Sequence, residues 1–280
     1  MKRYQRVILS SLLLAFTACS APEESQEIVL LQAQDTQLLE NNTLISPYTF
    51  SESLETVYDT APIKTVLKEM DSTRTGYSWM ISKVSTGSPA SITTTIRSTY
   101  DTKGNLLSTE QVPGSALETP ATPTVYQYGA KISIGSYFMT SIITRYGYDC
   151  VGCNIAIDGS AGTASDIRVR NTSVRQASGI YTDGITYEGY YIVAADKAFP
   201  FCTVLEIENR SFSGYGLVPG VPFKAIVLDR GSAIKTTHLD LYAGSEKNLV
   251  VYGGTNSNIK VTVVDFLQWT KNSYGQRICK

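Results

Sequence analysis

Short runs of β-branched and aromatic residues, separated by Gly, Ser and Asn, repeat from residue 132 to the C-terminus. No stretch there shows the apolar periodicity of a long helix, so the runs predict strands. Six or more short strands joined by turns favour a closed barrel, and the whole chain is expected to be all-β. The expected strands are residues 136–143, 189–194, 203–208, 223–228, 249–252 and 259–267.

A second β-rich stretch precedes this one. Residues 91–100 alternate β-branched and polar side chains, and the turn-like run from Asp101 to Asn105 leads to a return strand over 106–112. The stretch ends in Val125-Tyr-Gln-Tyr-Gly-Ala-Lys131, a Val-x-x-x-Gly-x-Lys tail. Such extended hairpins with this tail resemble the glycine-five (G5) domain, a small triple-stranded β module of wall-associated proteins. A generic β spacer is the alternative.

The start of the chain is typical of an export signal. Positive charges at Lys2, Arg3 and Arg6 precede the mostly apolar residues 7–16. A segment of this length is too short for a bilayer core of roughly 30 Å. Phe-Thr-Ala-Cys, ending at Cys19, resembles a bacterial lipoprotein cleavage box, although Leu is more usual where Phe16 stands. Processing there would leave Cys19 as the lipidated N-terminus, whereas ordinary signal-peptidase cleavage near Ser20 would discard it.

These patterns divide the chain into four segments. Residues 1–19 are the expected signal peptide, 20–53 a polar tether, 54–131 the G5-like spacer and 132–280 the barrel. No other run has the 18 or more apolar residues of a membrane span. The formal net charge of −1 argues against a nucleic-acid partner, which needs a concentrated basic face.

Four cysteines remain once Cys19 is set aside, namely Cys150, Cys153, Cys202 and Cys279. An even number in an exported chain favours disulfides, and three connectivities are open. A four-cysteine zinc site is the rival interpretation, because Cys150 and Cys153 have a metal-like spacing. The other two cysteines are solitary, however, and do not supply the second close pair of a zinc ribbon.

The run from Asp229 to Tyr242 carries most of the chemistry. It reads Asp-Arg-Gly-Ser-Ala-Ile-Lys-Thr-Thr-His-Leu-Asp-Leu-Tyr and contains the only histidine of the chain, His238. Its pattern D-x-G-x-A-I-K-x-x-H-x-D-x-Y resembles the signature of the three-Asp (3D) domain and of the A-type membrane-bound lytic transglycosylases. That resemblance implies a double-psi β-barrel.

The 3D domain is named after three aspartates, and each has a candidate here. Asp196 follows Val193-Ala-Ala in a step that resembles the family's, although its loop is one residue shorter and Cys202 stands where glycine is usual. Asp229 and Asp240 lie in the run itself. Cleavage of a glycosidic bond near neutral pH needs a carboxylic acid whose pKa is raised. Asp240 has the more apolar flanks, whereas Asp229 is expected to stay ionised beside Arg230.

The resemblance implies that Asp240 acts as acid and then base, with Asp229 in support. One carboxyl group is enough because the sugar's own 6-hydroxyl closes a 1,6-anhydro ring. Candidate substrate contacts are Asp196, Lys235, His238, Tyr242, Thr163 and Tyr146. His238 is interpreted as a hydrogen-bonding support, because a single histidine cannot build a zinc centre. No metal or cofactor is expected.

The sequence therefore predicts a lipid-anchored murein lytic transglycosylase, facing the cell wall and monomeric, whose partner is the peptidoglycan glycan strand. A non-catalytic wall-binding module is the first alternative. A structural adhesin is the second, but it leaves the run from Asp229 to Tyr242 unexplained.

Overall fold

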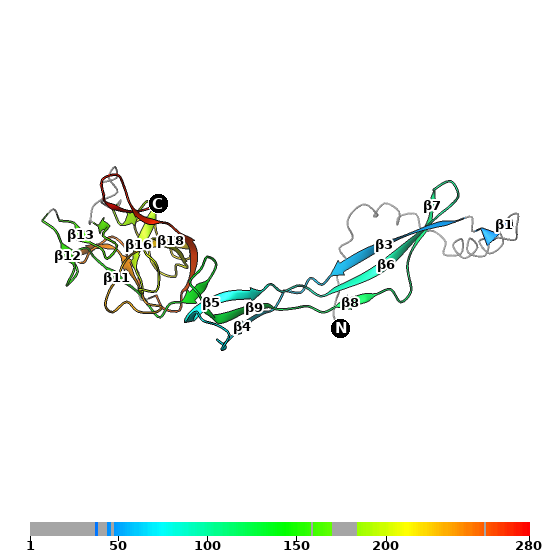
Figure 1. Cartoon of the computed structure of the whole chain (residues 1–280), viewed down its shortest axis with the longest axis horizontal. Helices are drawn as coiled ribbons and strands as arrows, with labels where there is room; N and C mark the ends of the chain where they lie inside the picture. Colours follow the sequence, from blue (N-terminus) through cyan, green and yellow to red (C-terminus); the bar gives the residue numbers. More distant parts are fainter. Residues whose placement is uncertain (1–36, 39–43, 46–47, 158, 170–183, 255) are drawn as a thin grey trace. The chain divides into compact units, whose positions relative to one another are not determined.

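The computed structural model describes residues 37–38, 44–45, 48–157, 159–169, 184–254 and 256–280 (Figure 1). Every element in that part of the chain is a β-strand, so the predicted all-β class is confirmed. Among the same residues there is no helix with the length and apolarity needed to cross a membrane. The signal segment and Cys19 lie outside the described residues, as does most of the predicted tether.

The chain folds into two compact units. Unit 1 combines Met1–Thr65 with Thr86–Thr124, and unit 2 combines Val66–Ser85 with Val125–Lys280. The domain limits expected from the sequence, at residues 54 and 131, stay predictions.

Unit 1 contains an antiparallel sheet centred on β6 (Ser91–Tyr100). Its partners are β3 (Thr49–Tyr58), β7 (Leu106–Gln111) and β8 (Leu117–Thr119). The predicted hairpin between β6 and β7 is confirmed. Its turn is held by the Asp101 carboxylate, which accepts hydrogen bonds from the backbone of Lys103 and Asn105 at 2.8 Å each. A separate pair joins β1 (Gln37–Leu38) and β2 (Leu44–Ile45).

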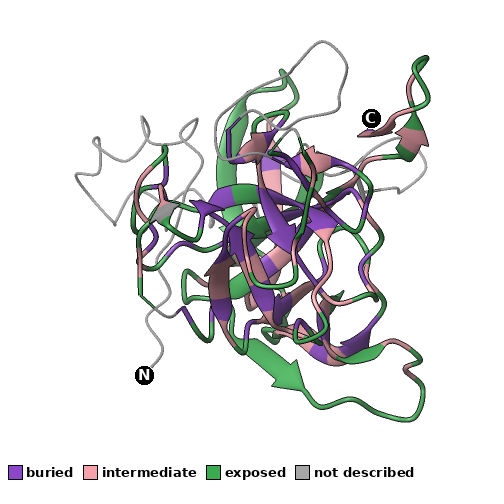
Figure 2. Ribbon diagram, turned by 90° about the vertical axis from the view of Figure 1, so that its left-hand side faces the viewer, coloured by how far each residue is buried: buried purple, intermediate pink, exposed green. Residues whose placement is uncertain are grey.

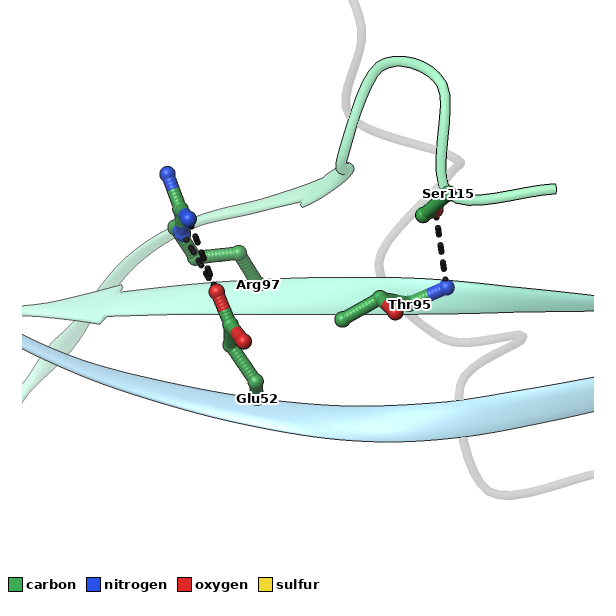
Figure 3. A network of polar contacts seen from close by, with 4 residues as sticks. All are labelled: Glu52, Thr95, Arg97 and Ser115. Atoms are coloured by element: carbon green, nitrogen blue, oxygen red, sulfur yellow. Dashed lines mark hydrogen bonds and ion pairs between the residues drawn. The ribbon is translucent and has the colours of Figure 1, made fainter.

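Polar contacts across the strands hold this sheet together (Figure 3). Arg97 on β6 forms an ion pair of 2.7 Å with Glu52 on β3, and the backbone N–H of Thr95 donates to the Ser115 hydroxyl at 3.0 Å. Both charged side chains are 40–50% exposed, so the pair is worth no more than about 1 kcal/mol. Thr99 is the only described residue of unit 1 that is buried. Backbone pairing therefore stabilises this sheet more than a core does.

Unit 2 is built on a mixed sheet with the strand order β11-β19-β16-β18-β17-β22-β10-β5-β9-β4. Two neighbouring pairs, β11 with β19 and β16 with β18, are parallel, and β16 and β19 are antiparallel. An up-and-down barrel has only antiparallel neighbours, so these pairs agree with the mixed topology of the expected double-psi barrel. The strands are β4 (Thr65–Lys68), β5 (Tyr77–Ser85), β9 (Thr124–Ala130), β10 (Tyr137–Met139), β11 (Ile143–Tyr146), β15 (Thr186–Tyr187), β16 (Tyr190–Ala194), β17 (Thr203–Ile207), β18 (Phe223–Asp229), β19 (Leu239–Tyr242) and β22 (Lys260–Phe266).

Three small sheets of two or three short strands complete the described part of unit 2. They are β12 (Asn154–Ile155), β13 (Ala161–Gly162) and β14 (Arg168–Val169) in one sheet, β20 (Gly244–Ser245) with β21 (Asn248–Leu249), and β23 (Trp269–Lys271) with β24 (Arg277–Cys279).

The core of unit 2 lies along β16, β18, β19 and β22 (purple in Figure 2). Ile192, Val193, Val227, Leu228 and Leu241 are completely buried. Strands covered on both faces read as nearly continuous apolar runs, which explains Ala-Ile-Val-Leu in β18. Burial of each such side chain contributes about 1.5–3 kcal/mol. This rigid centre carries the two aspartates of the motif at its strand ends.

The four remaining cysteines form two disulfides, Cys150–Cys153 and Cys202–Cys279, with Cα–Cα distances of 5.2 and 5.5 Å. Of the three open connectivities, the structure adopts this one. Cys202 has a φ of 68°, in the left-handed region that glycine tolerates best. The departure from the family's usual glycine therefore keeps the glycine-like backbone and adds a covalent link to β24.

Candidate functional site

Four neighbouring strands bring the motif residues into one row. Thr144 on β11 faces Asp240 on β19, Asp240 faces Ala194 on β16, and Ala194 faces Asp229 at the end of β18. Residues opposite one another in a sheet point to the same face, and adjacent strands lie roughly 4.8 Å apart. The Cα atoms of the two aspartates are therefore about 10 Å apart. Ala194, which is buried, stands between them on β16.

Asp240 is held by a short chain of hydrogen bonds. The Thr144 hydroxyl donates to the Asp240 carboxylate at 2.6 Å and lies 3.0 Å from Nε2 of His238. Because this hydroxyl has one proton and gives it to Asp240, Nε2 of His238 must be the donor to Thr144. His238 therefore supports Asp240 through Thr144, in agreement with the supporting role that the sequence predicts.

The pKa of the Asp240 carboxyl is raised, chiefly by burial. The Thr144 hydrogen bond and the His238 ring oppose this rise, and the charges of Glu246 and Asp229 add to it. A raised pKa is the property that a general acid needs near neutral pH.

Asp229 accepts hydrogen bonds from more donors than Asp240 does. One of its carboxylate oxygens accepts hydrogen bonds of 2.8 Å from the backbone N–H of Ala164 and from that of Arg230. Burial nevertheless raises the pKa of Asp229, while these two donors, Tyr146 and the Arg230 charge lower it. Burial thus opposes the ionised form while the donors and Arg230 favour it, and the expectation that Asp229 stays ionised remains a prediction.

Asp196 braces the loop that leads to the motif. One carboxylate oxygen accepts from the backbone of Ala198 at 2.8 Å, and the other accepts from the backbone of Thr236 at 2.7 Å. Thr236 has a φ of 53°, a conformation that a threonine adopts only when other contacts enforce it. Asp196 thus positions the loop before β19, and its predicted contact with substrate stays a prediction.

Three predicted substrate contacts have to be corrected. Tyr242 is fully buried, so its side chain has no surface to offer a ligand. Tyr146 is buried with its ring 5.4 Å from that of Tyr242, so it is not open for stacking on a sugar. The buried hydroxyl of Thr163 donates to the Ile167 carbonyl at 2.6 Å and serves its own turn. Lys235 is exposed beside the site, and its predicted contact stays a prediction.

Sequence reasoning missed two residues of the site. Thr144 contacts Asp240 across a parallel strand pair, and no local pattern reveals such a long-range register. Glu246 accepts a 2.8 Å hydrogen bond from the Gly147 backbone, and its charge raises the pKa of Asp240. Glu246 follows the motif closely in the sequence, so its carboxylate could have been recognised as a third acidic candidate. Gly147 has no side chain because a Cβ there would lie 2.2 Å from the Glu246 nitrogen.

Comparison with known proteins identifies one family. Residues 191–265 match the model of the 3D domain, and that span includes Asp196, Asp229 and Asp240. Two solved structures resemble parts of the chain. One is the G5 domain of IgA1 protease, at 18% identity over 30% of this chain and 93% of that one, with a TM-score of 0.19. The other is the G5 domain of HP0197, at 15% identity over 29% and 99%, with a TM-score of 0.16. No curated protein matches the chain.

Proposed function

Since residues 191–265 form a 3D domain, a domain of peptidoglycan-associated proteins, we propose that this protein is a murein lytic transglycosylase. It cleaves the glycosidic bond between N-acetylmuramic acid and N-acetylglucosamine and leaves a 1,6-anhydro end. The observation that carries the proposal is the row of Asp240 and Asp229 on β19 and β18, the two core strands on either side of β16, each with a carboxyl pKa raised by burial.

The mechanism assigns the proton to Asp240. Its protonated carboxyl gives the proton to the glycosidic oxygen as the bond to the muramic acid anomeric carbon breaks. The Asp229 carboxylate stabilises the positive charge that develops at that carbon. Asp240, now ionised, takes the proton from the 6-hydroxyl of the same sugar, whose oxygen bonds to the anomeric carbon and closes the ring. The proton that Asp240 donated is thereby restored.

The supporting residues fit these steps. Asp229 keeps two backbone donors and Arg230 beside it, so of the two acids it is the better stabilised as an anion. Asp240 has one hydroxyl donor, from Thr144, and two nearby carboxylates, Glu246 and Asp229. Two acids in contrasting environments can therefore act as a proton donor and a supporting anion.

The products decide the reaction. Purified peptidoglycan is incubated with the full chain, and the soluble muropeptides are analysed by mass spectrometry. We expect muramic acid ends that lack one water relative to the reducing form. Products with reducing ends only would make the protein a hydrolase and require a second essential carboxylate. Binding of the murein sacculus without any release would instead establish the wall-binding module.

We also propose that Cys19 is acylated and holds the protein at the outer face of a membrane, facing the wall. The basic start and the short apolar segment before Phe-Thr-Ala-Cys support this location.

A further inference from the structure

Tyr146 brings an unused hydroxyl into the site. Its side chain is 8% exposed, and its hydroxyl oxygen has no hydrogen-bond partner among the described residues. A buried donor without a partner is destabilising, and few native side chains carry that cost without a reason.

The strand register places the Tyr146 side chain on the face that carries Asp240. Tyr146 stands two residues after Thr144 on β11, so both side chains point to the face that carries Asp240. On the same face, Asp240 and Asp229 lie opposite Ala194 on either side of β16. Burial, followed by the charges of Asp229 and then Asp240, raises the pKa of the Tyr146 phenol well above its ordinary value. The phenol therefore keeps its proton and is available as a donor.

The contact with Asp229 is incomplete in this structure. Asp229 is close enough for Tyr146 to lower the pKa of its carboxyl, yet the hydroxyl meets no strict hydrogen-bond geometry. A contact outside that geometry leaves a buried donor unsatisfied. A bond to the Asp229 carboxylate would satisfy this donor whenever Asp229 carries its negative charge.

We propose that Tyr146 is a positioning residue whose hydroxyl donates a hydrogen bond to ionised Asp229, so that the single proton of the acid pair resides on Asp240. The role of this bond in catalysis rests on the proposed function, whereas the formation of the bond does not. It gives Tyr146 a role different from sugar stacking, which its burial prevents.

Other charged groups act on the same pair. Arg230 faces Asp229 and favours its ionised form. His238 favours the ionised form of Asp240, and Glu246 opposes it. None of these groups lies on β11, so a change of Tyr146 leaves them in place and isolates its own contribution.

The test is Tyr146→Phe in the full chain without ligand. Carboxyl carbons of 13C-labelled aspartate are titrated by NMR, with Asp229→Asn and Asp240→Asn to assign the two signals. We expect the midpoint of Asp229 to move to higher pH, because its anion loses a donor. The melting temperature should fall at a pH at which Asp229 is ionised, because the variant removes a donor to a buried carboxylate.

Tyr187→Phe is the matched control. Tyr187 is also buried, but its hydroxyl accepts from the Cys279 backbone N–H at 3.0 Å and donates to the Cys279 carbonyl at 3.5 Å. Its loss should lower the melting temperature by roughly 2–4 °C and leave the Asp229 titration unchanged. An Asp229 midpoint that does not move in Tyr146→Phe, or that moves to lower pH, overturns the proposal.

Activity provides the second measurement. The acidic limb of the pH profile for release of 1,6-anhydro products should shift upward in Tyr146→Phe, with roughly a tenfold loss of kcat. A lower kcat with an unchanged limb would mean a merely structural role and would also overturn the proposal. If wild type releases no such products but the Asp229 midpoint still shifts, the proposed function fails and the Tyr146–Asp229 bond stands.

Discussion

Asp240 and Asp229 share a face of the sheet but differ in the donors around them. Asp240 accepts from one hydroxyl, while Asp229 accepts from two backbone N–H groups and has Arg230 as its neighbour. Asp240→Asn should therefore lower the release of 1,6-anhydro muropeptides by at least about 10²–10⁴-fold, the value of general acid–base assistance. Asp229→Asn should lower it less, because its role is electrostatic. Comparable losses in both variants would contradict this division of roles, and circular dichroism and murein binding serve as controls for folding.

The same two acids predict a pH dependence of stability. Burial raises both pKa values above the ordinary 3.8, so the folded state binds these protons more tightly than the unfolded state does. Their contribution to stability is complete below about pH 3.8 and is lost as pH rises through the raised values in the folded protein. Asp240→Asn does not titrate at this position. The melting temperature of the variant minus that of wild type should therefore increase from pH 3 to pH 7. A difference that stays constant over this range would argue against a raised pKa of Asp240.

The residue scale also shows what the sequence reveals and what it hides. The run from Asp229 to Tyr242 identifies both acids and His238, because a local signature carries them. It does not reveal Thr144, whose contact with Asp240 depends on strand pairing over 96 positions. Nor does it show that Tyr242 is buried, because the cover over both faces of β19 comes from strands distant in sequence.

At the scale of elements, the two disulfides differ in how much chain they close. Cys202–Cys279 spans 77 positions and ties the start of β17 to β24, whereas Cys150–Cys153 spans 3 positions in the loop after β11. Each disulfide lowers the conformational entropy of the unfolded chain and so stabilises the folded protein. The long loop closed by Cys202–Cys279 contributes about 4–5 kcal/mol, and the short loop closed by Cys150–Cys153 about 2 kcal/mol. The even cysteine count predicts disulfides, but only the folded topology shows which cysteines meet.

Removing each disulfide in turn tests this difference. Denaturant unfolding of Cys202→Ser/Cys279→Ser should show the larger loss of stability, and Cys150→Ser/Cys153→Ser the smaller. Mass analysis of the untreated protein should find no free thiol among these four cysteines. One zinc ion bound per chain together with free thiols would refute the disulfides and revive the metal-site interpretation.

At the scale of the whole molecule, the two units are stabilised differently. Unit 2 has a continuous apolar core, while the described strands of unit 1 are held by backbone pairing and polar cross-strand contacts. Sequence patterns predict both as β-structure because alternation and turn residues are local signals. The mixed order of strands in unit 2 comes from pairings distant in sequence, which only the family resemblance anticipates.

The proposed membrane anchor concerns the whole molecule, although it rests on the first residues of the chain. Residues 7–16 would form a helix of roughly 15 Å, half the thickness of a bilayer core, so stable attachment needs acyl chains. We expect the native protein to partition into detergent with Cys19 acylated, and Cys19→Ser to release it into the medium, since two or more chains are needed for lasting attachment. Mass spectrometry of the mature N-terminus measures the modification directly. An unmodified, freely soluble native product that starts near Ser20 would show that ordinary signal-peptidase cleavage removes Cys19.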